Sequence, residues 1–177
     1  MSESFEFAAP DKLTVGTEGS PGRRVFFLQA RQGANVATLK MEKVQVAALA
    51  AWIAKTLEDL PAPGHLPEGE ELEPETFGDM AWAVGSLGGN YDIDSDRIVL
   101  VAAELTDEEL DEEGSDLLGG PGATARFLAT REQMAALAIR SALLVEAGRP
   151  TCPLCGYPLD PTGHQCIRTN GHRPPTL

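Results

Sequence analysis

Gln45-Val-Ala-Ala-Leu-Ala50 and Gln133-Met-Ala-Ala-Leu-Ala138 share one pattern, Q-x-A-A-L-A, repeated at an offset of 88 residues. The residues just before each copy also correspond in type, and residues 37–41 and 125–129 alternate as half-buried strands do. Further upstream, residues 24–30 resemble residues 97–103, and residues 13–16 resemble residues 82–85. Four elements in the same order indicate an internal duplication, with each half reading strand, strand, strand, helix.

Both predicted helices have clear ends. The first covers residues 43–60 and stops at Pro61, because proline cannot continue a helix. The second covers residues 131–147, where Thr130 and Gln133 form a capping box and Gly148 terminates the helix. The predicted fold class is therefore α+β, with two βββα repeats sharing a mostly antiparallel sheet. We expect the two long helices on one side of that sheet and a pseudo-twofold axis between the repeats.

The charge distribution divides the chain into a body and a tail. The net charge is −13, yet residues 148–177 hold three arginines and a single acid, Asp160. We predict a duplicated body over residues 1–148 and a zinc-knuckle-like tail over residues 149–177. In the body, repeat one covers 5–60, a solvated linker rich in proline and glutamate covers 61–76, and repeat two covers 77–148 with an acidic loop at 105–122.

The tail holds the only explicit chemistry of the sequence. Cys152 and Cys155 have the C-x2-C spacing that presents two thiolates to one metal ion, and Cys166 with His164 completes a Cys3His set. His172 is the alternative fourth ligand. Four protein ligands leave no open position, so we expect a structural Zn2+ rather than a catalytic one.

Composition indicates the cellular compartment and the class of partner. The N-terminus lacks the basic and apolar regions of a secretory signal, and no apolar stretch is long enough to span a membrane. We therefore expect a cytoplasmic protein, where three cysteines are more often metal ligands than disulfide partners. The acidic body disfavours nucleic acid, so the mildly basic tail would have to be the contact surface.

Two motifs have simpler interpretations. Asp92-Ile-Asp94-Ser-Asp96 starts like a calcium loop, but Arg97 replaces the required glycine, so we expect a polar hairpin turn. Gly85-Ser-Leu-Gly-Gly-Asn90 has the glycines of a phosphate loop without the lysine that follows them, and another hairpin turn is predicted there.

The tail, Cys152-Pro-Leu-Cys-Gly-Tyr-Pro-Leu-Asp-Pro-Thr-Gly-His-Gln-Cys-Ile-Arg-Thr-Asn-Gly171, resembles the C-terminal signature CPxCGxPLDPxGHxCxRxNG of an uncharacterised, largely actinobacterial family of unknown function. The strand at residues 26–31 and the turn at residues 16–22 resemble that family too. The resemblance implies the same metal ligands and an actinobacterial cytoplasm. It also implies that the neighbouring genes encode a phosphatase-like and a kinase-like protein. It supplies no catalytic residue, because no activity is established for the family.

These observations favour a non-enzymatic binding or adaptor protein of unknown pathway, with a sheet edge or the groove between the helices as its surface. A protein partner is expected and a homodimer is possible. The alternative is nucleic-acid binding through the tail, with a rim of Arg149, Arg168, Asn170, His172 and Arg173. A zinc-dependent hydrolase is a third hypothesis, and it requires an open position on the metal.

Overall fold

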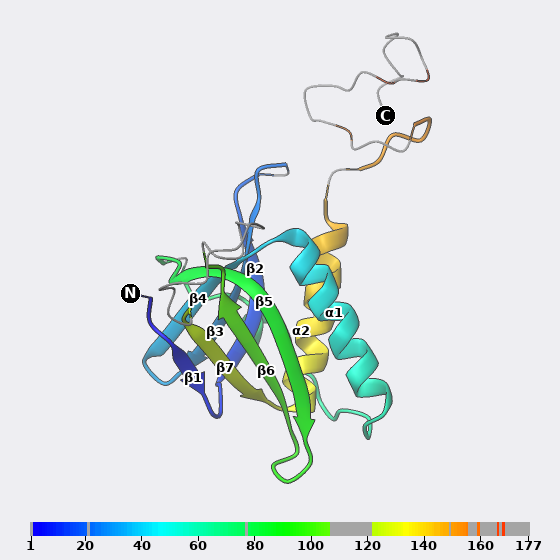
Figure 1. Ribbon diagram of the computed structural model, residues 1–177. Helices are drawn as coiled ribbons and strands as arrows, with labels where there is room; N and C mark the ends of the chain where they lie inside the picture. The colour runs from blue at the N-terminus through cyan, green and yellow to red at the C-terminus, as the bar shows by residue number, and fades with distance from the viewer. Residues whose placement is uncertain are drawn as a thin grey trace, which may run out of the picture.

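The computed structural model describes residues 2–20, 22–76, 78–106, 122–148 and 150–155, together with residues 159, 166 and 168. Figure 1 shows the arrangement of the helices and strands. In chain order they are β1 (Phe5–Phe7), β2 (Lys12–Glu18), β3 (Val25–Gln32), β4 (Asn35–Met41), α1 (Lys43–Glu58), the short 3-10 helix η1 (Gly69–Glu71), β5 (Trp82–Asp92), β6 (Arg97–Glu104), β7 (Thr124–Ala129) and α2 (Arg131–Glu146).

The seven strands form one mixed sheet in the order β1-β7-β6-β5-β4-β3-β2. Strand β5 runs parallel to β4 and β1 runs parallel to β7, whereas the other neighbouring pairs are antiparallel. The prediction of an α+β fold with a mostly antiparallel sheet is confirmed. Two successive βββα units, β2-β3-β4-α1 and β5-β6-β7-α2, make up most of it.

The two helices lie side by side and antiparallel on one side of the sheet (Figure 1). Corresponding positions of the repeated hexapeptide face the core: Val46 and Leu49 in α1, and Met134 and Leu137 in α2, are all buried. They pack against inward-facing strand residues such as Leu28, Leu39, Ile98, Leu100 and Phe127. The core therefore lies between the helix pair and the sheet, and burial of this apolar surface is the main stabilising contribution.

The glutamine at the start of each hexapeptide forms hydrogen bonds with both βββα units. The Gln45 Oε1 accepts a hydrogen bond from the backbone N–H of Glu42, and its Nε2 donates to the Val84 carbonyl of β5. In α2, the Gln133 Oε1 accepts from Thr130 and its Nε2 donates to the Pro10 carbonyl, just before β2. Each glutamine thus caps its own helix and binds the segment where the first strand of the other unit begins. The two units therefore make equivalent contacts with each other.

Part of the linker between the units is bound to the sheet. The Thr14 hydroxyl donates to the Leu72 carbonyl at 2.5 Å, and the Gln29 Oε1 accepts from the Glu75 backbone N–H at 2.7 Å. Thr14 and Gln29 are fully buried although they point away from the helices. Lys12 pairs with Glu75 at 3.0 Å. The linker has no buried residue, as expected of a solvated segment, but its last residues are bound to the sheet because they cover polar side chains of β2 and β3.

Helix α2 also covers the outer edge of the sheet. Strand β2 is the last strand in the order, and the Arg140 Nε of α2 donates to its Val15 carbonyl at 2.7 Å. The same guanidinium pairs with Glu73 of the linker at 3.2 Å. The Val15 carbonyl at this edge is therefore already bonded, and α1 packs directly on α2. The sheet edge and the groove between the helices stay predictions as binding surfaces.

Two local predictions about β5 and β6 had different outcomes. Residues 92–97 form the expected polar turn: the Asp92 carboxylate accepts from the Asp94 backbone and the Ser95 hydroxyl, and Asp96 pairs with Arg131. The turn predicted at residues 85–90 is wrong, because these residues lie inside β5. Of the glycines there, Gly89 serves packing, because a Cβ on it would lie 2.6 Å from the ring of Trp52.

The N-terminal strand β1 is absent from the predicted elements. It is only three residues long, too short for an alternating pattern to reveal. Its place is set by pairing with β7 and by the stacking of Phe7 on Phe127, whose ring centroids lie 5.6 Å apart. The sheet thus has a seventh strand that belongs to neither βββα unit.

The helix ends agree closely with the sequence. α1 ends two residues before the predicted Leu60, and α2 ends one residue before the predicted Ala147, which is its C-cap.

Most of the acidic loop at 105–122 lies outside the described residues, and the boundary between body and tail stays a prediction. Within the described part of the chain, no helix is both long and apolar enough to cross a membrane.

Candidate metal centre

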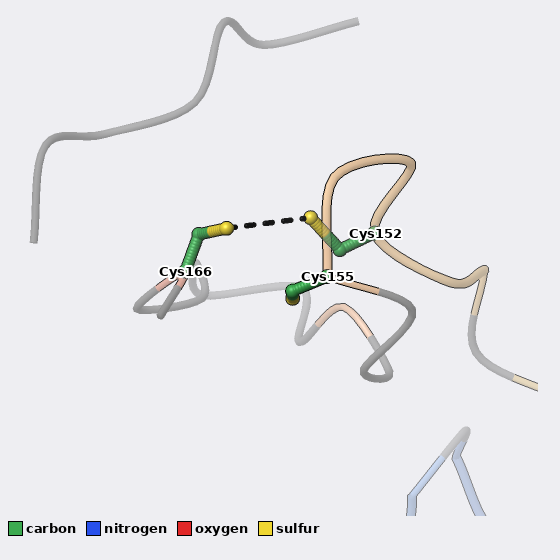
Figure 2. A group of neighbouring side chains, drawn as sticks. All are labelled: Cys152, Cys155 and Cys166. Carbon is green, nitrogen blue, oxygen red and sulfur yellow. Dashed lines mark hydrogen bonds between the residues drawn. The ribbon is translucent and has the colours of Figure 1, made fainter. Parts of the chain in front are cut away.

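Three cysteines meet in the segment that follows α2. Cys152 and Cys155 stand at the two ends of a turn through Pro153 and Leu154, and Cys166 returns to face them. The Sγ atoms of Cys152 and Cys166 are 3.9 Å apart, and all three sulfurs lie within 4.8 Å of one another (Figure 2). Cys152 and Cys166 are buried, and Cys155 is partly exposed.

This spacing fits a tetrahedral metal ion. Thiolates bound to zinc at about 2.3 Å lie roughly 3.8 Å from each other in a tetrahedron. A disulfide would bring two sulfurs to about 2.05 Å, far closer than the 3.9 Å between Cys152 and Cys166, so these two cysteines are not joined by a disulfide. The geometry is thus that of three ligands converging on one point, and the identity of the ion stays open.

The electrostatic surroundings of Cys152 favour the thiolate. The backbone N–H groups of Cys155 and Leu154 point at its sulfur and lower the pKa of Cys152 from 9.0 to about 6. A turn of this kind aims successive N–H groups at the first thiolate, because the chain folds back over it. Metal ions bind thiolates rather than thiols. The turn that brings two sulfurs together therefore also favours the metal-binding form of Cys152.

Few other interactions hold this segment in the described residues. The Leu159 backbone N–H donates to the Pro150 carbonyl at 2.8 Å, and Leu154 is exposed on the turn. Among the described residues of the segment, Cys152 and Cys166 are the buried ones. A bound ion is a common way to order a short segment with a small core.

The predicted ligands and rim residues are only partly placed. Cys152, Cys155 and Cys166 come together as the spacing predicts, whereas His164 and His172, the candidates for the fourth ligand, lie outside the described residues. Of the predicted partner rim, Arg168 is exposed. Arg149, Asn170, His172 and Arg173 lie outside the described residues, so the rim stays a prediction.

Fold and site together define an α+β protein with two consecutive βββα units on one sheet and a cysteine cluster able to hold a metal ion close behind the last helix. The chain belongs to the family described as "Protein of unknown function (DUF3090)", whose model matches residues 5–166. The match ends at Cys166, the third cysteine of the cluster, so the family covers the body and all three thiols. No curated protein and no solved structure matches this chain.

Proposed function

We propose that this protein is a non-enzymatic binding or adaptor protein whose tail is folded around a structural zinc ion. The observation that carries the proposal is the convergence of three sulfurs within 4.8 Å, in a segment where Cys152 and Cys166 are the buried members of the described residues. In this proposal Cys152, Cys155 and Cys166 are ligands and His164 is the fourth, with His172 as the alternative. An ion held this way stabilises the tail by on the order of 10 kcal/mol at neutral pH.

A structural role follows from the donor set. Three thiolates and an imidazole fill a tetrahedral zinc ion, so no position is left for water or substrate. A catalytic zinc usually has three protein ligands and keeps its fourth position open. The hydrolase hypothesis therefore requires that neither histidine binds the metal.

Metal content and coordination test the proposal directly. The purified full chain should contain one zinc per molecule, and X-ray absorption should give three sulfur ligands and one nitrogen ligand. His164→Asn and His172→Asn distinguish the two candidates, because only the true ligand's loss should replace the nitrogen with an oxygen. Three sulfurs plus oxygen in the unaltered protein would instead support the hydrolase, and absence of bound metal would end the zinc proposal.

The partner is proposed to be a protein, and the phosphatase-like and kinase-like neighbours implied by the family resemblance are the first candidates. Pull-down with the full chain, against a Cys155→Ser variant, should show whether capture depends on the folded tail. A salt-dependent gel shift with poly-dT and structured RNA addresses the nucleic-acid alternative. Binding at low salt, lost with charge reversal at Arg168, would replace the adaptor proposal by that alternative.

A further inference from the structure

A cavity of about 560 Å³ lies at the end of the body where α1 begins and α2 ends. Its walls come from β3, β4 and the first residues of α1. The residues that define its character are Arg24, Lys40, Glu42 and Lys43, with Phe26 and Met41 as apolar lining. Neither the metal centre nor the proposed adaptor role accounts for this cavity.

The cavity brings together cations that have no acidic partner among the described residues. The body holds eleven Lys and Arg residues, and among the described residues five of them form ion pairs with carboxylates: Lys12, Arg31, Arg126, Arg131 and Arg140. Within the described part of the chain, Arg24, Lys40 and Lys43 have no carboxylate within the 4.0 Å of an ion pair. Three positive side chains against one carboxylate, Glu42, leave the lining with a net charge of +2, in a protein whose net charge is −13.

Local structure fixes part of this charge in place. The Arg24 Nη1 donates to the Ala147 carbonyl at 2.8 Å, which ties the guanidinium to the end of α2 and offsets the negative end of that helix dipole. Lys43 is the first residue of α1, so the positive end of the α1 dipole adds to the lysine charges. Glu42 belongs to the capping box with Gln45, so this carboxylate has a structural role at the rim.

We propose that this cavity binds a small phosphate monoester. A phosphate monoester carries a charge close to −2 at neutral pH, which balances the lining, and three separate donors suit its three terminal oxygens. Phe26 and Met41 also line the cavity, but both are almost fully buried in the core and offer the ligand little surface. The acidic remainder of the body opposes binding only weakly, because charges farther than about 8 Å are screened at physiological ionic strength.

Titration of the isotope-labelled full chain with inorganic phosphate, phenyl phosphate and phenyl sulfate tests the proposal by amide chemical shifts. Phenyl sulfate has the shape of phenyl phosphate but a single charge. We expect saturable shifts at Lys43 and Gly148, and at least about tenfold tighter binding of phenyl phosphate than of phenyl sulfate. Equal binding of the two esters, or no saturation by about 10 mM, would overturn the proposal.

Three matched variants locate the effect. Lys43→Gln should weaken phenyl phosphate binding by about fivefold or more, and Glu42→Gln, which keeps an oxygen for the capping box, should strengthen it. Lys55→Gln is the control, because Lys55 is exposed on the same helix and does not line the cavity. A loss in Lys55→Gln equal to that in Lys43→Gln would mean that only overall charge matters. Circular dichroism of each variant verifies that the fold is kept, and the readout does not depend on the metal centre.

Discussion

The two glutamines of the repeated hexapeptide perform the same pair of tasks. Each accepts a hydrogen bond from the N-cap backbone of its own helix and donates one to a carbonyl of the other unit. A glutamine side chain can do both because it carries an acceptor and two donors. This explains why the glutamine recurs with the apolar positions, since losing it would affect the helix and the contact between units together.

We predict that Gln133→Ala destabilises the protein by about 1–3 kcal/mol, because the cap is lost and the Pro10 carbonyl loses its partner. Gln133→Glu keeps the accepting oxygen and removes the donor, so it should recover only the capping part of the loss. Urea unfolding of the three proteins measures both steps. Equal stability of the Glu variant and the unaltered protein would show that the bond to Pro10 contributes nothing.

Asp96 links the turn after β5 to the start of α2. Its carboxylate accepts from the Tyr91 hydroxyl at 2.7 Å and pairs with Arg131 at 3.1 Å. The hydrogen bonds from Tyr91 and Arg131 lower the pKa of Asp96 below its usual value. Asp96 also has a positive φ of 50°, which aspartate and asparagine tolerate better than most residues.

This carboxylate predicts an acid-dependent loss of stability. Because the pKa is lower in the folded state, the contribution is present above the unfolded pKa of about 3.9 and is lost as pH falls through the folded value. Melting temperatures of the protein and of Asp96→Asn should therefore differ at pH 7 and converge as the pH falls below about 4. Asp94→Asn, on the same turn, is the control. A constant difference across this range would contradict the assignment to Asp96 ionisation.

Strand β5 is unusual among the strands because it carries three glycines and a bulge. The register of its pairing with β6 shifts between Val84 and Ser86. Gly89 is where Trp52 of α1 comes closest: a Cβ there would lie 2.3 Å from the Val99 carbonyl oxygen and 2.6 Å from the indole. Glycine in a strand often marks such an approach, and here it lets the helix pack on the sheet.

Neighbouring glycines in β5 give a matched pair of variants. Gly89→Ala should cost about 1–3 kcal/mol, because the added methyl group would collide with a backbone atom that cannot rotate away. Gly88→Ala should be close to neutral, because nothing lies within 4 Å of the added carbon. Thermal unfolding of both variants measures the difference. Similar melting temperatures for the two would show that the sheet adjusts without cost.

At the level of the whole chain, the body and the described residues of the cysteine segment differ in the core that they form. The body has a continuous core between helices and sheet. The cysteine segment has two buried thiols and, in the described residues, few other internal contacts. The two parts should therefore respond differently to loss of the metal.

If the tail is folded around zinc as proposed, a chelator or Cys155→Ser should release the metal and unfold the tail, while far-UV circular dichroism and the main melting transition of the body remain nearly unchanged. Leu154→Ala is the matched control, because Leu154 is exposed on the same turn and offers no ligand. Metal content, limited proteolysis and melting curves measure the outcome. Global unfolding of Cys155→Ser would instead show that the metal centre is part of the body's core.

Local patterns accounted for much of the fold. The two helices, the strands before them and the turn after β5 were predictable, because helix caps, apolar periodicity and turn residues act over a few neighbours. The pairing of Cys152 with Cys155 was predictable for the same reason, because both stand on one turn. Strand β1 and the full length of β5 were not predictable, because they depend on partners far away in sequence. Strand β1 packs on Phe127, and β5 packs on Trp52.

The sequence by itself thus determined the α+β class, the repeated order of elements and the set of thiols that could hold a metal ion. Only the tertiary structure decided that each hexapeptide glutamine reaches into the other unit, and that the linker covers Thr14 and Gln29. It also brought Arg24, Lys40 and Lys43 around one cavity. Spacing along the chain reports on residues within a turn or two, whereas these contacts join segments that meet only after the sheet and both helices have packed.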